Sequence, residues 1–146
     1  IIKRVLDSTM MMNYLREVGA ILYFLLVINM DWFNIIKNLD YTYQVDAFEE
    51  ETDVIVSYKG HRVGYLYSAH LPLLIEKFKT AKILDLHLNP QHRGKGIGRK
   101  MYDKLLANLP IGVENLYGEW QDESSKSFWK HMGFEIKDKR IGKKIK

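Results

Sequence analysis

The sequence of 146 residues has no cysteine, only three prolines and no apolar run long enough to cross a membrane. Without cysteine, disulfide bonds and thiolate metal sites are excluded, whereas the redox state of the compartment is left open. A membrane-spanning helix needs about 20 apolar residues. The longest candidate, residues 20–28, is preceded by Arg16 and Glu17 and followed by Asn29. It also lacks a basic lead-in and a small-residue cleavage site, so we expect neither a membrane anchor nor a signal peptide.

The composition that remains is that of an ordinary globular protein, with 47% hydrophobic and 27% charged residues. A chain of this length buries roughly two-thirds of its unfolded surface as one domain. We therefore expect a single domain over residues 1–146, atypical in residues 1–50, in a cytoplasmic protein. The net charge of +4 suits an anionic ligand without requiring nucleic acid. Because the first residue is Ile rather than Met, we expect a chain that was trimmed, processed or cut from a longer one.

The N-terminal third predicts mainly helices. Residues 10–30 are mostly apolar and predict a buried helix, preceded by a short strand within residues 1–6. Asp31 is a good cap for a second, shorter helix that extends to residue 39. From Tyr41 to Ala47, apolar and polar residues alternate, which indicates a strand or an extended segment.

The remainder of the chain alternates between strand and helix patterns. Residues 53–58 and 62–67 predict two strands of a hairpin, joined by the tight turn Lys59-Gly60-His61. Residues 68–80 are expected to form a linker. Later in the chain we expect a strand over residues 113–120, a helix over residues 124–132 that ends at Gly133, and strands over residues 134–137 and 141–145.

The middle of the chain combines a strand, a glycine-rich turn and a helix. Apolar residues between Ile83 and Leu88 fall on both sides of the pleat and predict a strand buried on both faces. Asp85 and His87 alternate with the leucines of this strand and point to the face opposite them. From Ile97 onward, apolar residues recur at helical spacing and predict an amphipathic helix.

The turn between this strand and helix is built to bind phosphate. Its glycines, which let the backbone approach a ligand at a helix N-terminus, are Gly94, Gly96 and Gly98. Positive side chains surround them: Arg93, Lys95, Arg99 and Lys100. Spacing excludes two classes of phosphate loop. A Rossmann fingerprint requires glycine where Arg99 stands, and a P-loop requires Gly-Lys-Ser/Thr where the chain has Gly98-Arg99-Lys100-Met101.

The segment Gln91-His92-Arg93-Gly94-Lys95-Gly96 resembles the acetyl-CoA loop of the GNAT N-acetyltransferases, which reads Gln/Arg-x-x-Gly-x-Gly/Ala. Leu88-Asn89-Pro90 ahead of it is similar to the Val-x-Pro strand exit of that family, and the preceding hairpin resembles the family's hairpin. The resemblance covers about residues 53–134. It implies an α/β fold with a mixed, mostly antiparallel sheet flanked by helices on both faces.

By this resemblance, the end of the central strand would pair with the pantetheine arm of acetyl-CoA, and the loop amides would hold the pyrophosphate. The residues implied in binding are Leu86, His87, Leu88, Gln91, Arg93, Gly94, Lys95, Gly96, Ile97, Gly98, Arg99 and Trp129. Residues 16–40 and 68–80 would set the acceptor, with the second segment covering the acceptor site. No metal site is expected, and His92 and His131, which lack metal-ligand spacing, are interpreted as bystanders. The resemblance leaves a homodimer open.

The chain departs from the family at the end of its last helix. GNAT sequences commonly have Leu-Tyr-x-x-x-Gly-Phe there, and the tyrosine can protonate the leaving CoA thiolate. Here Phe128-Trp129 precedes Gly133-Phe134, and an indole N–H is no proton-transferring acid near neutral pH. Asp122 stands, by counting, where the family usually has asparagine.

A carboxylate is still required to remove the proton of an ammonium acceptor. Glu119 is our first candidate, because it ends the strand over residues 113–120 at the mouth of the site. Asp85 is the second, because it lies deeper along the central strand. Tyr117 shares the face of Glu119 and is the candidate proton donor.

These observations predict an N-acetyltransferase that moves an acetyl group from acetyl-CoA to a primary amine of a small molecule or protein. The alternative is a non-catalytic CoA-binding regulatory module, which the missing tyrosine motivates. Nucleic-acid binding through the basic residues 137–146 is a weaker alternative, since such runs more often form a solvated edge strand. No membrane partner is expected.

Overall fold

The computed structural model describes Asn13, residues 16–22 and residues 40–146, and the chain divides into two compact units, residues 1–40 and 41–146. Asn13 and residues 16–22 are helical, as predicted. The predicted burial is wrong for the described part of this run, because Ile21 is 61% and Leu22 41% exposed. An apolar run favours burial but does not supply the surface that would cover it.

The strand predicted within residues 1–6 and the helix predicted over residues 31–39 lie outside the described residues. The single domain expected from chain length remains a prediction. No helix of the described residues is long and apolar enough to span a membrane.

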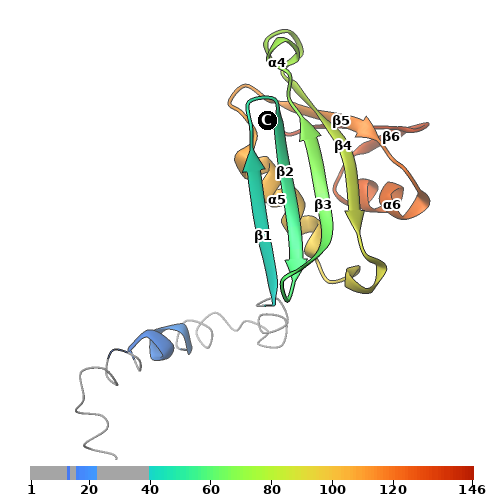
Figure 1. The fold of residues 1–146 in the computed structure, drawn as a ribbon. Coiled ribbons are helices and arrows are strands. Elements are labelled where there is room, and N and C mark those ends of the chain that lie inside the picture. The colour runs from blue at the N-terminus through green and yellow to red at the C-terminus, as the bar shows by residue number, and fades with distance from the viewer. Residues whose placement is uncertain (1–12, 14–15, 23–39) are drawn as a thin grey trace, which may run out of the picture. The chain divides into compact units, whose positions relative to one another are not determined.

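The second unit is built on a seven-stranded sheet with the order β1-β2-β3-β4-β5-β7-β6 (Figure 1). Its strands are β1 (Tyr41–Ala47), β2 (Glu51–Tyr58), β3 (His61–Ala69), β4 (Thr80–Leu88), β5 (Asn115–Glu119), β6 (Glu135–Lys137) and β7 (Arg140–Lys144). Only β4 and β5 pair in parallel, and every other neighbouring pair is antiparallel. The predicted fold class, an α/β fold with a mixed and mostly antiparallel sheet, is confirmed, whereas helices on both faces of the sheet remain a prediction.

Two longer helices lie on one face of this sheet. The helices of the unit are α4 (Pro72–Phe78), the 3₁₀ turn η1 (Pro90–His92), α5 (Ile97–Asn108) and α6 (Glu123–His131). Helix α5 packs across β1, β2 and β3, and α6 contacts β6 (Figure 1). The two helices meet through the rings of Tyr102 and Trp129, which are edge to face with centroids 6.2 Å apart.

The prediction of a linker over residues 68–80 is wrong, because this segment contains the last residues of β3, the whole of α4 and the first residue of β4. Pro72 occupies the first turn of α4, where its missing N–H is tolerated and its fixed φ favours the helix. A short helix of this kind has too few residues for its apolar periodicity to stand out. The predicted hairpin is confirmed: Lys59 and Gly60, at φ 48° and 81°, connect β2 to β3 in a two-residue turn.

The core lies between the sheet and α5. The sheet contributes the fully buried Val54, Val56, Leu66, Ala81, Ile83 and Leu116. Helix α5 contributes a stripe that is at most 4% exposed, formed by Ile97, Met101, Tyr102 and Leu105. Burying an aliphatic side chain of this size contributes about 1.5–3 kcal/mol, so this stripe fixes the start of α5 against the sheet. The helix predicted to begin at Ile97 is confirmed.

A β-bulge in β4 changes which side chains face the core. Tyr67 pairs with Asp85 and Ser68 with Ile83, so Leu84 has no partner on β3. Leu84 lies on the side opposite Ile83 and is 42% exposed, and the extra residue switches the alternation beyond it, so that Leu86 and Leu88 pack against the core on the side of Ile83. The prediction that β4 is buried on both faces is therefore wrong at Leu84. Asp85 lies opposite Leu86 and Leu88, as predicted, on the side of the sheet that carries Tyr65 and Tyr67 of β3.

Strands β4 and β5 pair only over their first residues. The parallel ladder runs from Thr80↔Asn115 to Ile83↔Gly118 and ends where the bulge begins. The two strands come very close at this last pair, because a Cβ on Gly118 would lie 2.7 Å from the carbonyl oxygen of Ile83. Beyond it, the edge of β4 that faces β5 makes no strand pairing among the described residues.

We expect Gly118→Ala to lower the free energy of unfolding by about 1–3 kcal/mol, because the added methyl group overpacks the last β4–β5 pair. Gly142→Ala is the matched control, since a Cβ there lies 3.8 Å from the nearest atom, the carbonyl oxygen of Leu116. Urea denaturation of both variants measures the difference. Equal stability of the two variants would contradict the close contact between β4 and β5.

Candidate functional site

A cleft of about 490 Å³ lies beside the unpaired end of β4. Three segments line it: the end of β4, the glycine turn with the start of α5, and α6. Most of the predicted binding residues are brought together here, namely Leu86, His87, Leu88, Arg93, Gly94, Gly96, Ile97, Gly98 and Arg99. Volumes of this order are typical of small-molecule sites.

Three predicted binding residues lie outside the lining of the cleft. Gln91 and Lys95 are exposed on the turn. Trp129 is 1% exposed and packs edge to face against Phe128 and Phe134, with centroids 4.9 and 4.8 Å away. The neighbouring Phe128 lines the cleft instead, and it lies so close to α5 that a Cβ on Gly98 would be 2.8 Å from its ring.

The glycine turn and the first residues of α5 line the cleft. Gly94 and Gly96 have φ of 73° and 80°, a left-handed conformation that side chains disfavour. Gly96 is the N-cap of α5, no described side chain caps this helix, and its first turn has no acidic residue. The first N–H groups of a helix lack intrahelical acceptors and carry partial positive charge. The start of α5 is therefore suited to an anion.

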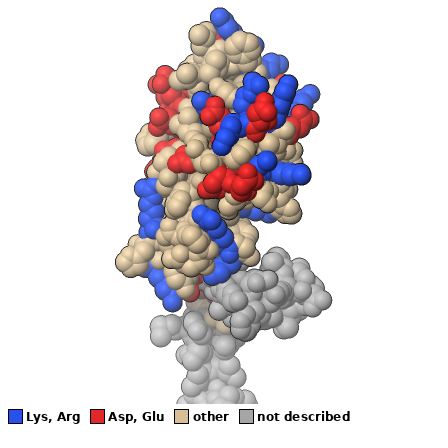
Figure 2. Space-filling model, turned by 90° about the vertical axis from the view of Figure 1, so that its right-hand side faces the viewer, with Lys and Arg blue, Asp and Glu red and all other residues tan. Residues whose placement is uncertain are grey.

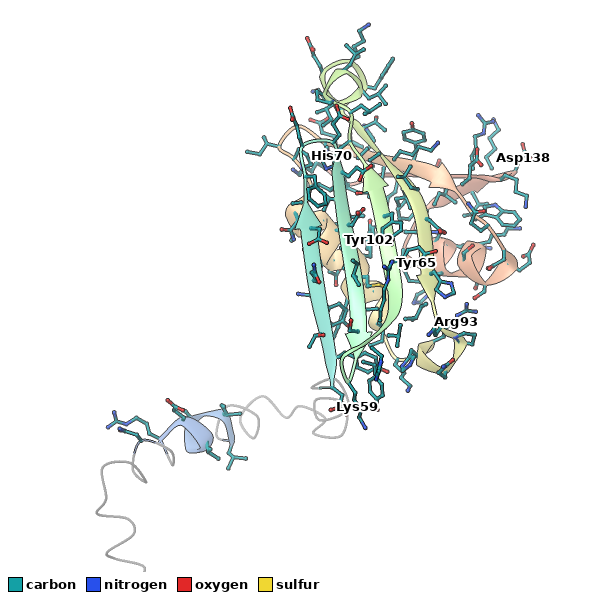
Figure 3. The ribbon with its side chains drawn as sticks, in the orientation of Figure 1. Lys59, Tyr65, His70, Arg93, Tyr102 and Asp138 are labelled. Atoms are coloured by element: carbon teal, nitrogen blue, oxygen red, sulfur yellow. The ribbon has the colours of Figure 1, made fainter. Side chains whose placement is uncertain are left out.

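Arg93 connects two walls of the cleft. Arg93 lies in the turn below the end of β4 (Figure 3). Its Nε donates a hydrogen bond to the carbonyl oxygen of Leu88 at 2.8 Å, and its guanidinium reaches Oγ of Ser124 at 3.4 Å. Arg99 adds a second guanidinium to the lining. On the side that carries α6 and β6, positive and negative side chains are interspersed rather than separated into one large basic area (Figure 2). The positive charge beside the glycine turn is a local feature of the cleft.

The wall from α6 is the part that the sequence analysis missed. It contributes three hydroxyl side chains, Ser124, Ser125 and Ser127, together with Phe128 and His131. Asp122 begins the helix by accepting a hydrogen bond from the Ser125 amide at 2.8 Å, while Oγ of Ser125 accepts one from the Asp122 amide at 3.1 Å. The run of serines in the first turn of this helix was the available signal. The serines could be recognised as part of the cleft only once α6 was known to lie beside α5.

The two candidate carboxylates, Glu119 and Asp85, follow the point where β4 and β5 part, and neither is among the residues that line the cleft. Glu119 follows the last pair directly and is exposed, and among the described residues it makes no ion pair. Asp85 is half-buried and accepts a hydrogen bond from the Tyr65 hydroxyl at 2.8 Å. This hydrogen bond raises the pKa of Tyr65 above its ordinary value, and burial adds to the effect. Tyr65 therefore keeps its proton near neutral pH.

Tyr117 lies apart from the cleft. Its ring is 39% exposed, 5.9 Å from Nζ of Lys82, and it lines a separate shallow depression with Arg140 and Lys144. His92 and His131, interpreted as bystanders, are both close to the turn or cleft: His131 lines the cleft, and His92 is buried beneath the turn at 8% exposure.

Comparisons with known proteins agree with this architecture. A family model described as "Acetyltransferase (GNAT) family" matches residues 22–134. A search of curated proteins gives no match. Among solved structures, the chain is similar to an acetyltransferase from Thermus thermophilus, at 23% identity and a TM-score of 0.54, over 66% of this chain and 65% of that one.

Two further structures have the same fold. The PaiA N-acetyltransferase from Thermoplasma acidophilum, solved in complex with coenzyme A, has 18% identity and a TM-score of 0.53, over 65% of this chain and 61% of that one. Nourseothricin acetyltransferase has 13% identity and a TM-score of 0.57, over 73% of this chain and 85% of that one. The chain spans less than two thirds of the Thermus and Thermoplasma proteins. At these identities the likeness shows the fold.

We expect Asp122→Ala to lower the free energy of unfolding by about 0.5–2 kcal/mol, because it removes the N-cap of α6. Asp122→Asn retains an oxygen that accepts from the Ser125 amide and is expected to be close to the parent protein. Guanidinium denaturation of the three proteins checks this. If all three proteins have the same free energy of unfolding, the N-cap of α6 does not contribute to stability, which would contradict this prediction.

Proposed function

Because the chain belongs to the GNAT acetyltransferase family, we propose that it transfers an acetyl group from acetyl-CoA to a primary amine of a small molecule or a protein. One observation carries the proposal: the cleft joins the unpaired edge of β4 to the uncapped N-terminus of α5. An open strand edge suits the amide groups of an extended pantetheine arm, and a helix N-terminus suits a pyrophosphate.

Different residues of the cleft would bind different parts of acetyl-CoA. Peptide groups of Leu86–Leu88 would accept and donate hydrogen bonds to the pantetheine arm. Amides from Gly94 to Gly98 would hold the pyrophosphate, with Arg93 and Arg99 on its oxygens. Hydroxyl groups of α6 face the same space and supply further donors. Acetyl-CoA itself supplies the thioester carbon that the amine attacks.

The acceptor amine is mostly an ammonium ion at neutral pH, so a base must take its proton before it can attack. Glu119 is our candidate, because its carboxylate is exposed beside the parting of β4 and β5 and makes no ion pair among the described residues. Asp85 ranks second, since its Oδ2 already accepts the hydrogen bond of Tyr65. Tyr117 remains the candidate proton donor, and like both carboxylates it lies outside the lining of the cleft.

A regulatory module that binds CoA without turnover is the second candidate function. It is favoured by Trp129, which stands where the resemblance expects a tyrosine and lies in the core at 1% exposure. Release of free CoA thiol from acetyl-CoA, measured with a panel of primary amines and peptides, distinguishes the two. Tight CoA binding without release above the hydrolysis background would favour the module.

We expect CoA and acetyl-CoA at a hundredfold excess over Kd to stabilise the protein by about 2.7 kcal/mol. In a chain of this length, this corresponds to a rise in Tm of roughly 5–10 °C. Gly96→Val should abolish the rise, because a branched side chain at positive φ distorts the turn. Gly60→Val is the matched control, since Gly60 has almost the same φ, 81° against 80°, in the hairpin turn of β2 and β3. Absence of a CoA-dependent rise in the parent protein would overturn the proposal.

We expect Glu119→Gln to lower kcat by about 10²–10⁴-fold, the usual contribution of a positioned base. The Kd for acetyl-CoA should not change, and activity should partly recover at high pH, where the amine loses its proton without help. Steady-state assays from about pH 6 to 10 on the parent, Glu119→Gln and Asp85→Asn measure the two losses in kcat. Full activity of Glu119→Gln together with a large loss in Asp85→Asn would reverse our ranking of the two carboxylates.

A further inference from the structure

The glycine turn is fixed to the rest of the protein at two points. Of the residues from Asn89 to Gly98, only His92 and Ile97 are buried, at 8% and 1% exposure. The four residues between them, Arg93 to Gly96, are all exposed. Ile97 belongs to the core stripe of α5, so it fixes the end of the turn. His92 fixes its beginning.

His92 is held by two tyrosines from a distant part of the sheet. Its Nδ1 is hydrogen-bonded to the hydroxyl of Tyr41 at 2.7 Å. The imidazole lies edge-on to the Tyr41 ring with centroids 5.6 Å apart, and tilted against the Tyr58 ring at 5.0 Å. The two tyrosines are paired in register, at the start of β1 and the end of β2, and their own rings are 4.9 Å apart. Together the three rings form a closed aromatic cluster beneath the turn.

The position of His92 determines the backbone on both sides of it. Its amide donates to the carbonyl of Asn89 at 2.9 Å, and the amide of Asn89 donates to the carbonyl of Val63 at 2.8 Å, which continues the β3–β4 ladder. Arg93 follows directly, and its amide donates to the carbonyl of Pro90 at 3.2 Å. The next residues include two glycines, which have the largest conformational freedom of any residue. Fixing His92 therefore limits the conformations open to the turn before a ligand arrives.

We propose that His92 is a positioning residue for the phosphate-binding turn, and that its hydrogen bond to Tyr41 preorganises the turn for CoA. The inference rests on the proposed binding of acetyl-CoA in the cleft. His92 does not line the cleft, so it acts on the ligand only through the turn. Ordering a segment in advance removes part of the entropy loss of binding, so a weaker anchor raises Kd without altering the chemical step.

Tyr41→Phe tests this with the removal of one oxygen atom. The ring contacts stay, while Nδ1 of the buried imidazole loses its partner. We expect the Kd for CoA, measured by calorimetry, to rise about 3- to 10-fold, as for the loss of one hydrogen bond. The KM for acetyl-CoA should rise by the same factor while kcat at saturation does not change.

Tyr43→Phe is the matched control. Tyr43 lies two residues along the same strand, and its buried hydroxyl has no hydrogen-bond partner among the described residues. The same atom is removed from the same strand without affecting His92, so the Kd for CoA should equal that of the parent.

A third variant measures the coupling between the two partners. His92→Phe alone should weaken CoA binding, because it leaves the hydroxyl of Tyr41 unpaired beside the turn. The double variant Tyr41→Phe/His92→Phe replaces both partners by apolar rings, so its rise in Kd should be smaller than the product of the two single rises. If His92→Phe does not fold, Tyr41→Phe and Tyr43→Phe still decide the question.

The outcomes separate this inference from the proposed function. A lower Tm in Tyr41→Phe with an unchanged Kd would make the cluster merely structural and overturn the inference. If the parent binds CoA and the Kd values of Tyr41→Phe and Tyr43→Phe are equal, the inference about His92 is overturned, whereas the proposed function is not affected. No CoA binding by the parent would overturn both.

Discussion

The parting of β4 and β5 after the pair Ile83↔Gly118 is the constraint on which the rest of the structure depends. The strands are pressed together there, with room for no side chain at Gly118, and the bulge at Leu84 follows at once. A parallel ladder that continued would have used the peptide groups of β4 up to Leu88. Because it stops, β4 keeps an edge with which no other described strand pairs, and residues at that end of β4 line the cleft.

The other two walls of the cleft are the glycine turn with the start of α5, and α6. The chain leaves β4 through η1, returns to the core at Ile97 and starts α5, which no side chain of the described residues caps. The N-terminus of α5 and the end of β4 therefore line the same cleft. Helix α6 closes the opposite side, with Phe128 against Gly98 and hydroxyl groups along its first turn. The free edge of β4, the N-terminus of α5 and the hydroxyl-bearing wall of α6 form one cleft beside the place where the two strands separate.

The sequence predicted those parts whose signal is local. The hairpin at Lys59-Gly60, the helix from Ile97 and the glycine turn each depend on residues that are close in the chain, and each was found. The bulge at Leu84 was missed, because it results from how β4 pairs with β3. The role of α6 and the burial of His92 were missed for the same reason, since both depend on partners far along the chain. Trp129 shows the limit of matching by position: the motif placed it at the cofactor, and packing against Phe128 and Phe134 keeps it out of the lining of the cleft.

Loss of the tyrosine at position 129 fits the energetics of the proposed reaction. A primary amine with a pKa of about 10.4 must give up a proton before it attacks, whereas a thiol with a pKa of about 8.5 leaves as a thiolate that water can protonate afterwards. At pH 7 the loss of the amine proton is uphill by about 3.4 pKa units, or roughly 4.6 kcal/mol, whereas protonation of the thiolate is downhill. Under the proposed reaction, Glu119 or Asp85 would meet the costly proton transfer, while position 129 serves the packing of the core.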